Sequence, residues 1–245
     1  MIDLKLQIII YGPGAKGDFL AGWLGTLPNY VDNTWCINPN TGRSTGKMMI
    51  FKKLGYPDTI SDLLQPHRIS LSASSDLIWA CTNHGSPESM AAIQDLVDKD
   101  LAEIIYIDTS RTNPQDLLWN YFVKMYLSEE KFLHKLENNS VWYIDQFINQ
   151  SNITNSHRIN YLQTVLKQSL DYKLLTTYQV IPNSIVLDYN CTFVSGGSEY
   201  VNKKLKINIS PRNQCHWDSM IALSESPNEI MVWGHCWKKA DYFNQ

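Results

Sequence analysis

Residues 8–25 read "IIIYGPGAKGDFLAGWLG" and join a short apolar run to an amphipathic helical pattern through a glycine-rich turn. A continuous apolar run bounded by turn residues is typical of a buried strand. In an open parallel sheet, such a turn lies beyond the carboxyl end of its strand, where ligands bind. The turn also offers backbone N–H groups and the positive end of the helix dipole to an anion. This stretch therefore predicts a strand, an anion-binding loop and a helix.

The residues of the loop indicate which kind of anion it is suited to bind. Lys16 adds a positive charge, and three glycines allow positive φ and close approach to a ligand: Gly12, Gly14 and Gly17. The Walker pattern would require Lys and Ser/Thr where the chain has Asp18 and Phe19. Loss of the hydroxyl removes the usual magnesium ligand and disfavours an ordinary ATPase, while Asp18 is suited to cap the helix. A strand-to-helix turn without a ligand is the alternative interpretation.

The rest of the chain repeats this alternation of strands and helices. Short apolar runs predict four strands, at 6–11, 76–82, 102–108 and 184–189. Helical patterns follow the first three, at 17–27, 86–100 and 113–128, and a fourth occupies 198–208. Strands that are apolar on both faces suit a mostly parallel sheet covered by helices. We expect a single α/β domain over 1–245, with three layers and a helical insertion at 129–180.

The composition of the chain disfavours several classes of protein. Lys+Arg of 21 against Asp+Glu of 24 gives a formal charge of −3, so the chain does not predict a nucleic-acid surface. The five cysteines form no CxxC pair, which favours free thiols in a reducing compartment. No segment reaches the ~20 apolar residues of a spanning helix, and the first apolar run is too short for a signal peptide. We expect a cytoplasmic protein without a membrane span.

Two further stretches carry candidate functional residues. "ACTNHGSPES" places His84 just after the second strand, where a pKa near ~6.5 suits a general base. Its alternative is an exposed loop histidine beside a helix start. "IIYIDTSRTNPQDLLWN" places Arg111 after the third strand, where its forked donors suit phosphate, and Asn120 on the following helix. Their alternatives are a solvated arginine and an ordinary surface asparagine.

These stretches together resemble the P-loop sulfotransferase family. "PGAKGDF" (13–19) aligns with the first signature P-[KR]-S-G-[ST]-T-[WF], sharing Pro13 and Phe19. "RTNPQDLLWN" (111–120) resembles R-N-P-x-D-x-x-x-S, with Thr112 inserted and Asn120 in place of the serine. "TNH" (82–84) is similar to the T-H pair that supplies the base, and "LDYNCTF" (187–193) is similar to the "YEDL" strand. The family's late R-K-G-x-x-G motif has no recognisable counterpart.

The resemblance implies a P-loop nucleotide-hydrolase-like fold and transfer of a sulfonate from PAPS to a hydroxyl acceptor, with PAP as product and no metal. His84 would deprotonate the acceptor, and Lys16 would stabilise the leaving phosphate. Arg111 and Asn120 would bind the 3′-phosphate. The residues assigned to donor binding are Gly12, Pro13, Gly14, Ala15, Lys16, Gly17, Asp18 and Phe19, together with Arg111 and Asn120. Three tryptophans are candidates for an acceptor cleft or for the core: Trp35, Trp142 and Trp217.

Other functions stay open at this point. A nucleotide or small-molecule kinase would use the same scaffold but needs a magnesium ligand. A non-catalytic binding protein would retain the fold without the donor site, and Asp18 favours it because a carboxylate opposes a bound anion. The pairs Cys215–His216 and His235–Cys236 are weak candidates for a metal site, because neighbouring side chains diverge in direction.

Overall fold

The computed structural model describes residues 5–12, 14–32, 77–83, 87–127, 154–171 and 181–243. The chain divides into two compact units, each described here by itself. Unit 1 comprises Met1–Thr112 and Thr176–Ser224, and unit 2 comprises Asn113–Leu175 and Glu225–Gln245. This division leaves the single domain expected from the sequence as a prediction.

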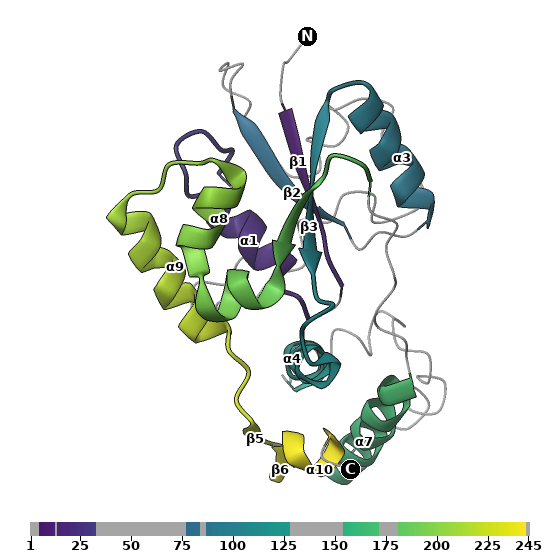
Figure 1. Cartoon of the computed structure of the whole chain (residues 1–245). Helices are drawn as coiled ribbons and strands as arrows, with labels where there is room; N and C mark the ends of the chain where they lie inside the picture. The colour runs from purple at the N-terminus through teal and green to yellow at the C-terminus, as the bar shows by residue number, and fades with distance from the viewer. Residues whose placement is uncertain are drawn as a thin grey trace. The chain divides into compact units, whose positions relative to one another are not determined.

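A four-stranded, all-parallel sheet forms the centre of unit 1 (Figure 1). Its strands are β1 (Lys5–Ile10), β2 (Ile78–Asn83), β3 (Ala102–Asp108) and β4 (Ile185–Asp188), in the order β2-β1-β3-β4. At the end of β1, Ile10 pairs with Asn83 on one side and with Tyr106 on the other. The four predicted strands and the α/β class are therefore confirmed.

Helices cover both faces of this sheet. In Figure 1, α1 (Gly17–Leu24), α8 (Gly197–Leu205) and α9 (Pro211–Ser224) lie on one side, and α3 (Pro87–Asp98) lies on the other. The central strands require this cover because five of the six residues of β1 are buried, on both faces of the strand. The arrangement is consistent with a three-layer α/β fold.

An aromatic cluster fixes α1 against α9 and the π-helical turn η3 (Cys191–Ser195). Trp217 meets Trp23 edge to face at 4.7 Å between ring centroids and stacks parallel to Phe193 at 5.9 Å. Trp23 is fully buried, and its Nε1–H donates to the carbonyl of Asn213 at 3.0 Å. Large buried rings with satisfied polar atoms dominate core energetics, so this cluster holds α1 in place.

Unit 2 contains α4 (Pro114–Tyr126), α7 (Asn155–Asp171), the strands β5 (Glu229–Val232) and β6 (His235–Lys238), and α10 (Lys239–Phe243). Helix α4 begins as the sequence predicts: Asn113 accepts a hydrogen bond from the N–H of Gln115 at 3.0 Å, and proline follows at the first helical position. The core of the unit is aromatic, with Trp119, Phe122 and Trp237 buried together.

The β5–β6 hairpin of unit 2 was not predicted from the sequence. Its two-residue turn consists of Trp233 and Gly234, with φ of 55° and 77°. A type I′ turn requires positive φ at both positions, and tryptophan is an uncommon residue there. The side chain of Arg158 lies 5.8 Å from the Trp233 ring centroid and holds it by a cation–π contact.

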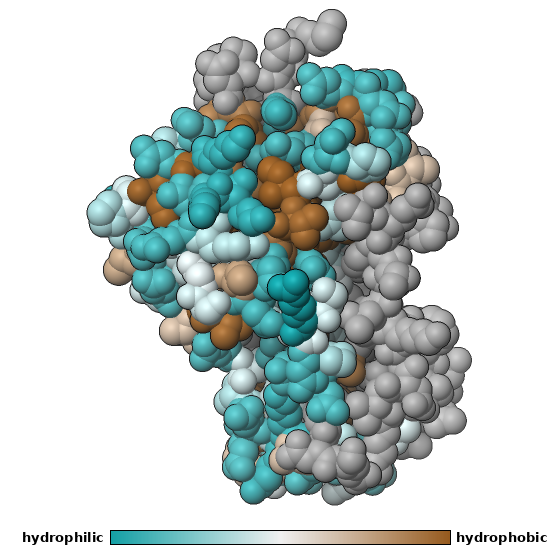
Figure 2. All heavy atoms as spheres, viewed as in Figure 1, coloured by the Kyte–Doolittle hydropathy of each residue, from teal (hydrophilic) through white to brown (hydrophobic). Residues whose placement is uncertain are grey.

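Some sequence predictions fall outside the described residues. Of the expected insertion at 129–180, the structure describes α7 and its immediate surroundings, and the expected loop at 29–48 is described only to residue 32. Within the described part of the chain, no helix is both long and apolar enough to cross a membrane. The described surface on the face shown in Figure 2 is mostly hydrophilic, with small hydrophobic areas between.

Candidate functional site

The strand order creates a topological switch point between β1 and β3. The chain passes from β1 to β2 on one side of β1, whereas β4 lies on the opposite side of β3. Ligands of open α/β sheets bind beyond the carboxyl ends of the strands at such a point. The loops that carry Lys16 and Arg111 follow β1 and β3, which are neighbours in the sheet. Two of the predicted phosphate-binding side chains therefore come from loops at the same edge.

The loop after β1 is a tight turn. The N–H of Ala15 donates to the carbonyl of Gly12 at 3.1 Å, and φ is positive at Gly14 (82°) and at Lys16 (57°). A lysine in the left-handed region costs about 1–2 kcal/mol, so the surrounding structure imposes this conformation. The sequence predicted flexibility at the glycines but not the left-handed lysine. Pro13 lies outside the described residues.

Gly17 serves packing, not backbone conformation. A Cβ atom at this position would lie 2.1 Å from Cδ1 of Tyr11, so the first residue of α1 rests against the tyrosine ring. Tyr11 is itself 4 % exposed. The Tyr11 ring thus packs against the start of α1, and only glycine fits at position 17.

Asp18 points toward the sheet. The hydroxyl of Thr82 on β2 donates to its Oδ1 at 2.9 Å, and both side chains are buried. The first residue before α1 is Lys16, and it makes no side-chain capping bond. The hydrogen bond described for Asp18 therefore ties α1 to β2, whereas the sequence favoured a capping role along the helix.

Lys16 links the loop to the segment after β4. Its Nζ lies 6.0 Å from the ring centroid of Phe193 in η3, within the range of a cation–π contact. Phe193 is buried and belongs to the aromatic cluster, so the lysine approaches a rigid surface. This contact brings the end of β4 to the same edge as the first loop.

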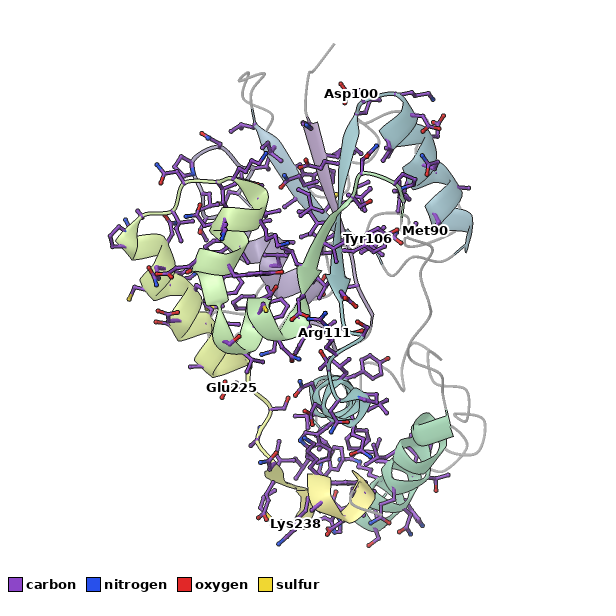
Figure 3. The ribbon with its side chains drawn as sticks, in the orientation of Figure 1. Met90, Asp100, Tyr106, Arg111, Glu225 and Lys238 are labelled. Atoms are coloured by element: carbon purple, nitrogen blue, oxygen red, sulfur yellow. The ribbon has the colours of Figure 1, made fainter. Side chains whose placement is uncertain are left out.

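Arg111 follows β3 in a short, hydrogen-bonded turn (Figure 3). The N–H of Thr112 donates to the carbonyl of Thr109 at 2.9 Å, which closes the turn. Asn190, just after β4, donates from Nδ2 to the carbonyl of Arg111 at 3.1 Å. The arginine side chain is exposed, so its guanidinium faces solvent from an anchored backbone. Asn120 lies on α4 in unit 2 and is partly exposed.

The end of β4 carries charges of both signs. Partial burial and the Asp188 carboxylate raise the pKa of the Cys191 thiol, while the positive charges of Arg111 and Lys204 oppose the increase. The Asp188 carboxylate also accepts a hydrogen bond from the Cys191 N–H at 2.9 Å. Arg111 and Lys204 thus act on the same group as Asp188, so charges of both signs lie near this end of the strand.

Several predicted residues cannot be placed. His84, Trp35 and Trp142 lie outside the described residues. Trp217 is the one acceptor candidate that the structure describes, and it is 2 % exposed within the aromatic cluster. Core packing is therefore its main role, although one edge of it also lines a pocket.

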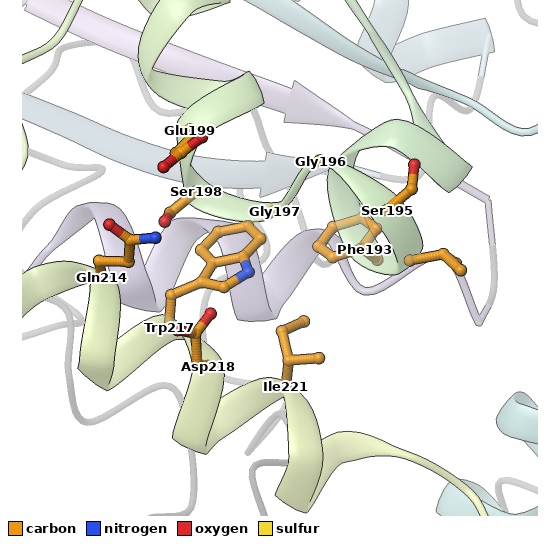
Figure 4. A pocket seen from close by; sticks show the side chains of 11 residues that line it. Phe193, Ser195, Gly196, Gly197, Ser198, Glu199, Gln214, Trp217, Asp218 and Ile221 are labelled. Carbon is orange, nitrogen blue, oxygen red and sulfur yellow. The ribbon is translucent and has the colours of Figure 1, made fainter.

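That pocket was missed by sequence reasoning. Residues 193–199, which join η3 to the start of α8, face α9 across a cavity of about 330 Å³ (Figure 4). From α9 the lining residues are Gln214, Trp217, Asp218 and Ile221. The available signal was the pair Gly196–Gly197 between a strand and a helix, the same pattern that marks the first loop.

The pairs considered as metal ligands lie on α9 (Cys215–His216) and on β6 (His235–Cys236). Among the residues that the structure describes, no group of three or more His, Cys, Asp or Glu side chains is close enough to hold a metal ion.

Comparisons with protein-family models, with curated proteins and with solved structures found no significant match.

Proposed function

We propose that the chain binds PAPS at the switch point of its sheet and transfers the sulfonate to a hydroxyl group. One observation carries this proposal: Lys16 and Arg111 lie in two loops that follow adjacent parallel strands. Phosphate groups bind at this position in open α/β sheets, and both side chains supply positive charge there. The sequence resemblance to sulfotransferases supplies the reaction.

In this proposal, the chemistry requires positioning and stabilisation of negative charge. Lys16 and the amides at the start of α1 hold the 5′-phosphosulfate, and Arg111 holds the 3′-phosphate. His84 takes the proton of the acceptor hydroxyl while the oxygen of that hydroxyl forms a bond to sulfur. The bond between sulfur and the bridging phosphate oxygen breaks, and PAP leaves with the negative charge that Lys16 stabilises.

The position of Asp18 is compatible with an anion in the loop. A carboxylate in the first turn of α1 would repel phosphate if it faced the ligand. The Thr82 hydroxyl instead donates a buried hydrogen bond to one of its oxygens on the sheet side. The same residue supports the second candidate, a non-catalytic binding protein, because its negative charge still lies close to the positive end of the helix.

A calorimetric titration tests the donor site. We expect PAP to bind and Arg111→Ala to weaken it by about tenfold to a hundredfold, as loss of a charged hydrogen bond does. Adenosine 5′-phosphate, which lacks the 3′-phosphate, should bind the variant and the unaltered chain equally. Arg212→Ala, at an exposed arginine on α9, is the matched control and should change neither affinity. Absence of saturable PAP binding at millimolar concentration, or equal losses for both nucleotides, would contradict the proposal.

Release of PAP separates the two candidate functions. An enzyme should convert PAPS to PAP faster when a suitable hydroxyl compound is present, and His84→Ala should abolish the increase. A chain that binds PAP but never releases it from PAPS with any acceptor in a broad panel of sugars, phenols and alcohols would be a binding protein.

A further inference from the structure

The pocket between η3, α8 and α9 contains a buried hydroxyl group without a described partner. Ser198 is 2 % exposed, and its Oγ has no hydrogen-bond partner among the described residues. The residue lines the pocket, and Figure 4 shows its oxygen on the side facing Gln214 and Trp217. Since buried hydroxyls are normally hydrogen-bonded, this group is a candidate partner for a bound ligand.

The start of α8 adds backbone donors to the same wall. Within α8, a nine-residue helix, the N–H of Tyr200 donates to the Gly196 carbonyl at 3.2 Å. The preceding N–H groups, at residues 197–199, therefore have no acceptor within the helix. Gly196 and Gly197 carry no side chains that would cover them, and both glycines line the pocket.

Residues with acceptor groups line the same pocket. Glu199 and Asp218 place carboxylates in the lining, and Gln214 offers both a carbonyl and an amide. Among the residues that the structure describes, no lysine, arginine or histidine lines the pocket. The apolar part consists of edges of Phe193 and Trp217 together with Val194 and Ile221.

This combination of charges selects against ions of either sign. Two carboxylates without a cation repel an anion from the α8 amides. The positive end of α8, equivalent to about half a charge, opposes a cation at the same place and already interacts with Glu199 in its first turn. A hydroxyl group meets both requirements, because it accepts from an amide or from Ser198 and donates to a carboxylate.

We propose that this pocket binds a neutral polyhydroxyl compound of the size of a monosaccharide. Its volume of about 330 Å³ is at the lower end of small-molecule sites, which suits a single ring. Ser198 and the α8 amides donate to ring hydroxyls, and Asp218 accepts from them. The inference goes beyond the nucleotide site and does not depend on it, since no described residue of the first loop or of the Arg111 turn lines this pocket.

Nuclear magnetic resonance on ¹⁵N-labelled protein tests the proposal. The probes are methyl α-glucopyranoside and myo-inositol, with methylammonium chloride and sodium acetate as charged comparisons. We expect at least one neutral probe to shift the amide resonances of Ser198 and Glu199 saturably at millimolar concentration, while neither ion does so. Ser198→Ala should weaken that binding about fivefold, the loss expected for one hydrogen bond. Ser219→Ala, at an exposed serine outside the pocket on the same helix as Asp218, should leave it unchanged.

Asp218→Asn provides a second test that does not disturb the buried wall, because Asp218 is exposed. It should weaken the neutral probe at least as much as Ser198→Ala, since a charged acceptor is lost. No saturable shift with either neutral probe, a stronger response to methylammonium or acetate, or full binding by both variants would overturn the proposal. A failure of PAP to bind in a separate titration would contradict the nucleotide site alone.

Discussion

Two glycine turns in unit 1 introduce helices on the same side of the sheet, yet they differ in what covers them. All eight residues of α1, including its first turn, are buried. At α8, Ser198 is buried, but Gly197 is partly exposed, Glu199 is exposed, and both line a pocket. The turn before α1, which the sequence predicts as a phosphate site, is the more tightly packed of the two. The turn before α8, which was not predicted as a site, is the more open.

The difference shows that glycine can be required in a strand-to-helix turn for more than one physical reason. Gly17 is required because the ring of Tyr11 occupies the space of a side chain. Gly197 is required because its φ is +54°, while a Cβ atom there would meet Trp217 at ordinary contact distances of 3.4 and 3.8 Å. Only the second cause leaves room for a ligand beside the glycine itself, so at α1 a ligand has to approach over Gly14 and Lys16.

The largest expected effect concerns these two glycines. Gly17→Ala places a methyl group 2.1 Å from the Tyr11 ring and should lower the free energy of unfolding by about 3 kcal/mol, near the upper end for overpacking. Gly197→Ala meets its nearest atom, Nε1 of Trp217, at an ordinary 3.4 Å and should lose only about 1 kcal/mol, from its positive φ. Urea denaturation of both variants measures the difference. Equal losses would show that packing does not separate the two turns.

The next effect concerns two buried hydroxyl groups. Thr82→Val removes the donor to the Asp18 carboxylate and should lower the free energy of unfolding by about 1–3 kcal/mol, since a buried acceptor loses a partner. Ser198→Ala removes a hydroxyl without a described partner and should change stability by less than about 0.5 kcal/mol without ligand. Thermal and urea unfolding check both values. A large loss for Ser198→Ala would assign that hydroxyl a structural role.

A smaller effect is expected for the left-handed lysine. Lys16→Gly relieves positive φ but increases the freedom of the unfolded chain, so stability should change by no more than about 1 kcal/mol. Binding of PAP should nevertheless fall about tenfold, because a charged contact to phosphate is lost. The control is Lys203→Ala, at an exposed lysine on α8. Alanine is used because Lys203→Gly is unsuitable within a helix. Unchanged PAP affinity in Lys16→Gly would remove Lys16 from the site.

The last effect appears only at alkaline pH and concerns a buried thiol on β2. Burial raises the pKa of the Cys81 thiol well above its ordinary value. Above pH ~8.5 the unfolded chain loses this proton while the folded chain keeps it, so stability falls by about 1.4 kcal/mol per pH unit. Below that pH the contribution is fully present. Cys81→Ala should make the decline shallower by that amount in urea denaturation between pH 8 and 10; an identical slope would contradict the assignment.

The four strands of the sheet and the helices at 17–24, 87–98 and 114–126 were predictable because each depends on local apolar pattern and turn residues. The β5–β6 hairpin was not, because tryptophan at a left-handed position contradicts the usual turn chemistry and its ring is held by Arg158 of α7. The residues of the first loop were found, but not the ring of Tyr11 under Gly17. Such a contact depends on side-chain direction, which the pattern does not encode.

The pocket at α8 could not be predicted for a related reason. It depends on the π-helical turn before it, in which the N–H of Gly196 donates to the carbonyl of Cys191 at 2.8 Å. A Cβ at Gly196 would lie 2.6 Å from that same carbonyl oxygen. The glycine pair was visible in the sequence, but nothing there showed that α9 would face it with Asp218 and Gln214.

One titration of PAP into ¹⁵N-labelled protein addresses the phosphate site most directly, because it reads both turns at once. With nucleotide bound over the first loop, the amide signals of Gly14 and Lys16 move saturably, while those of Gly197 and Ser198 stay within the scatter of a buffer titration. Stationary signals at Gly14 and Lys16, or movement confined to Gly197 and Ser198, would contradict the placement of the donor at the switch point between β1 and β3.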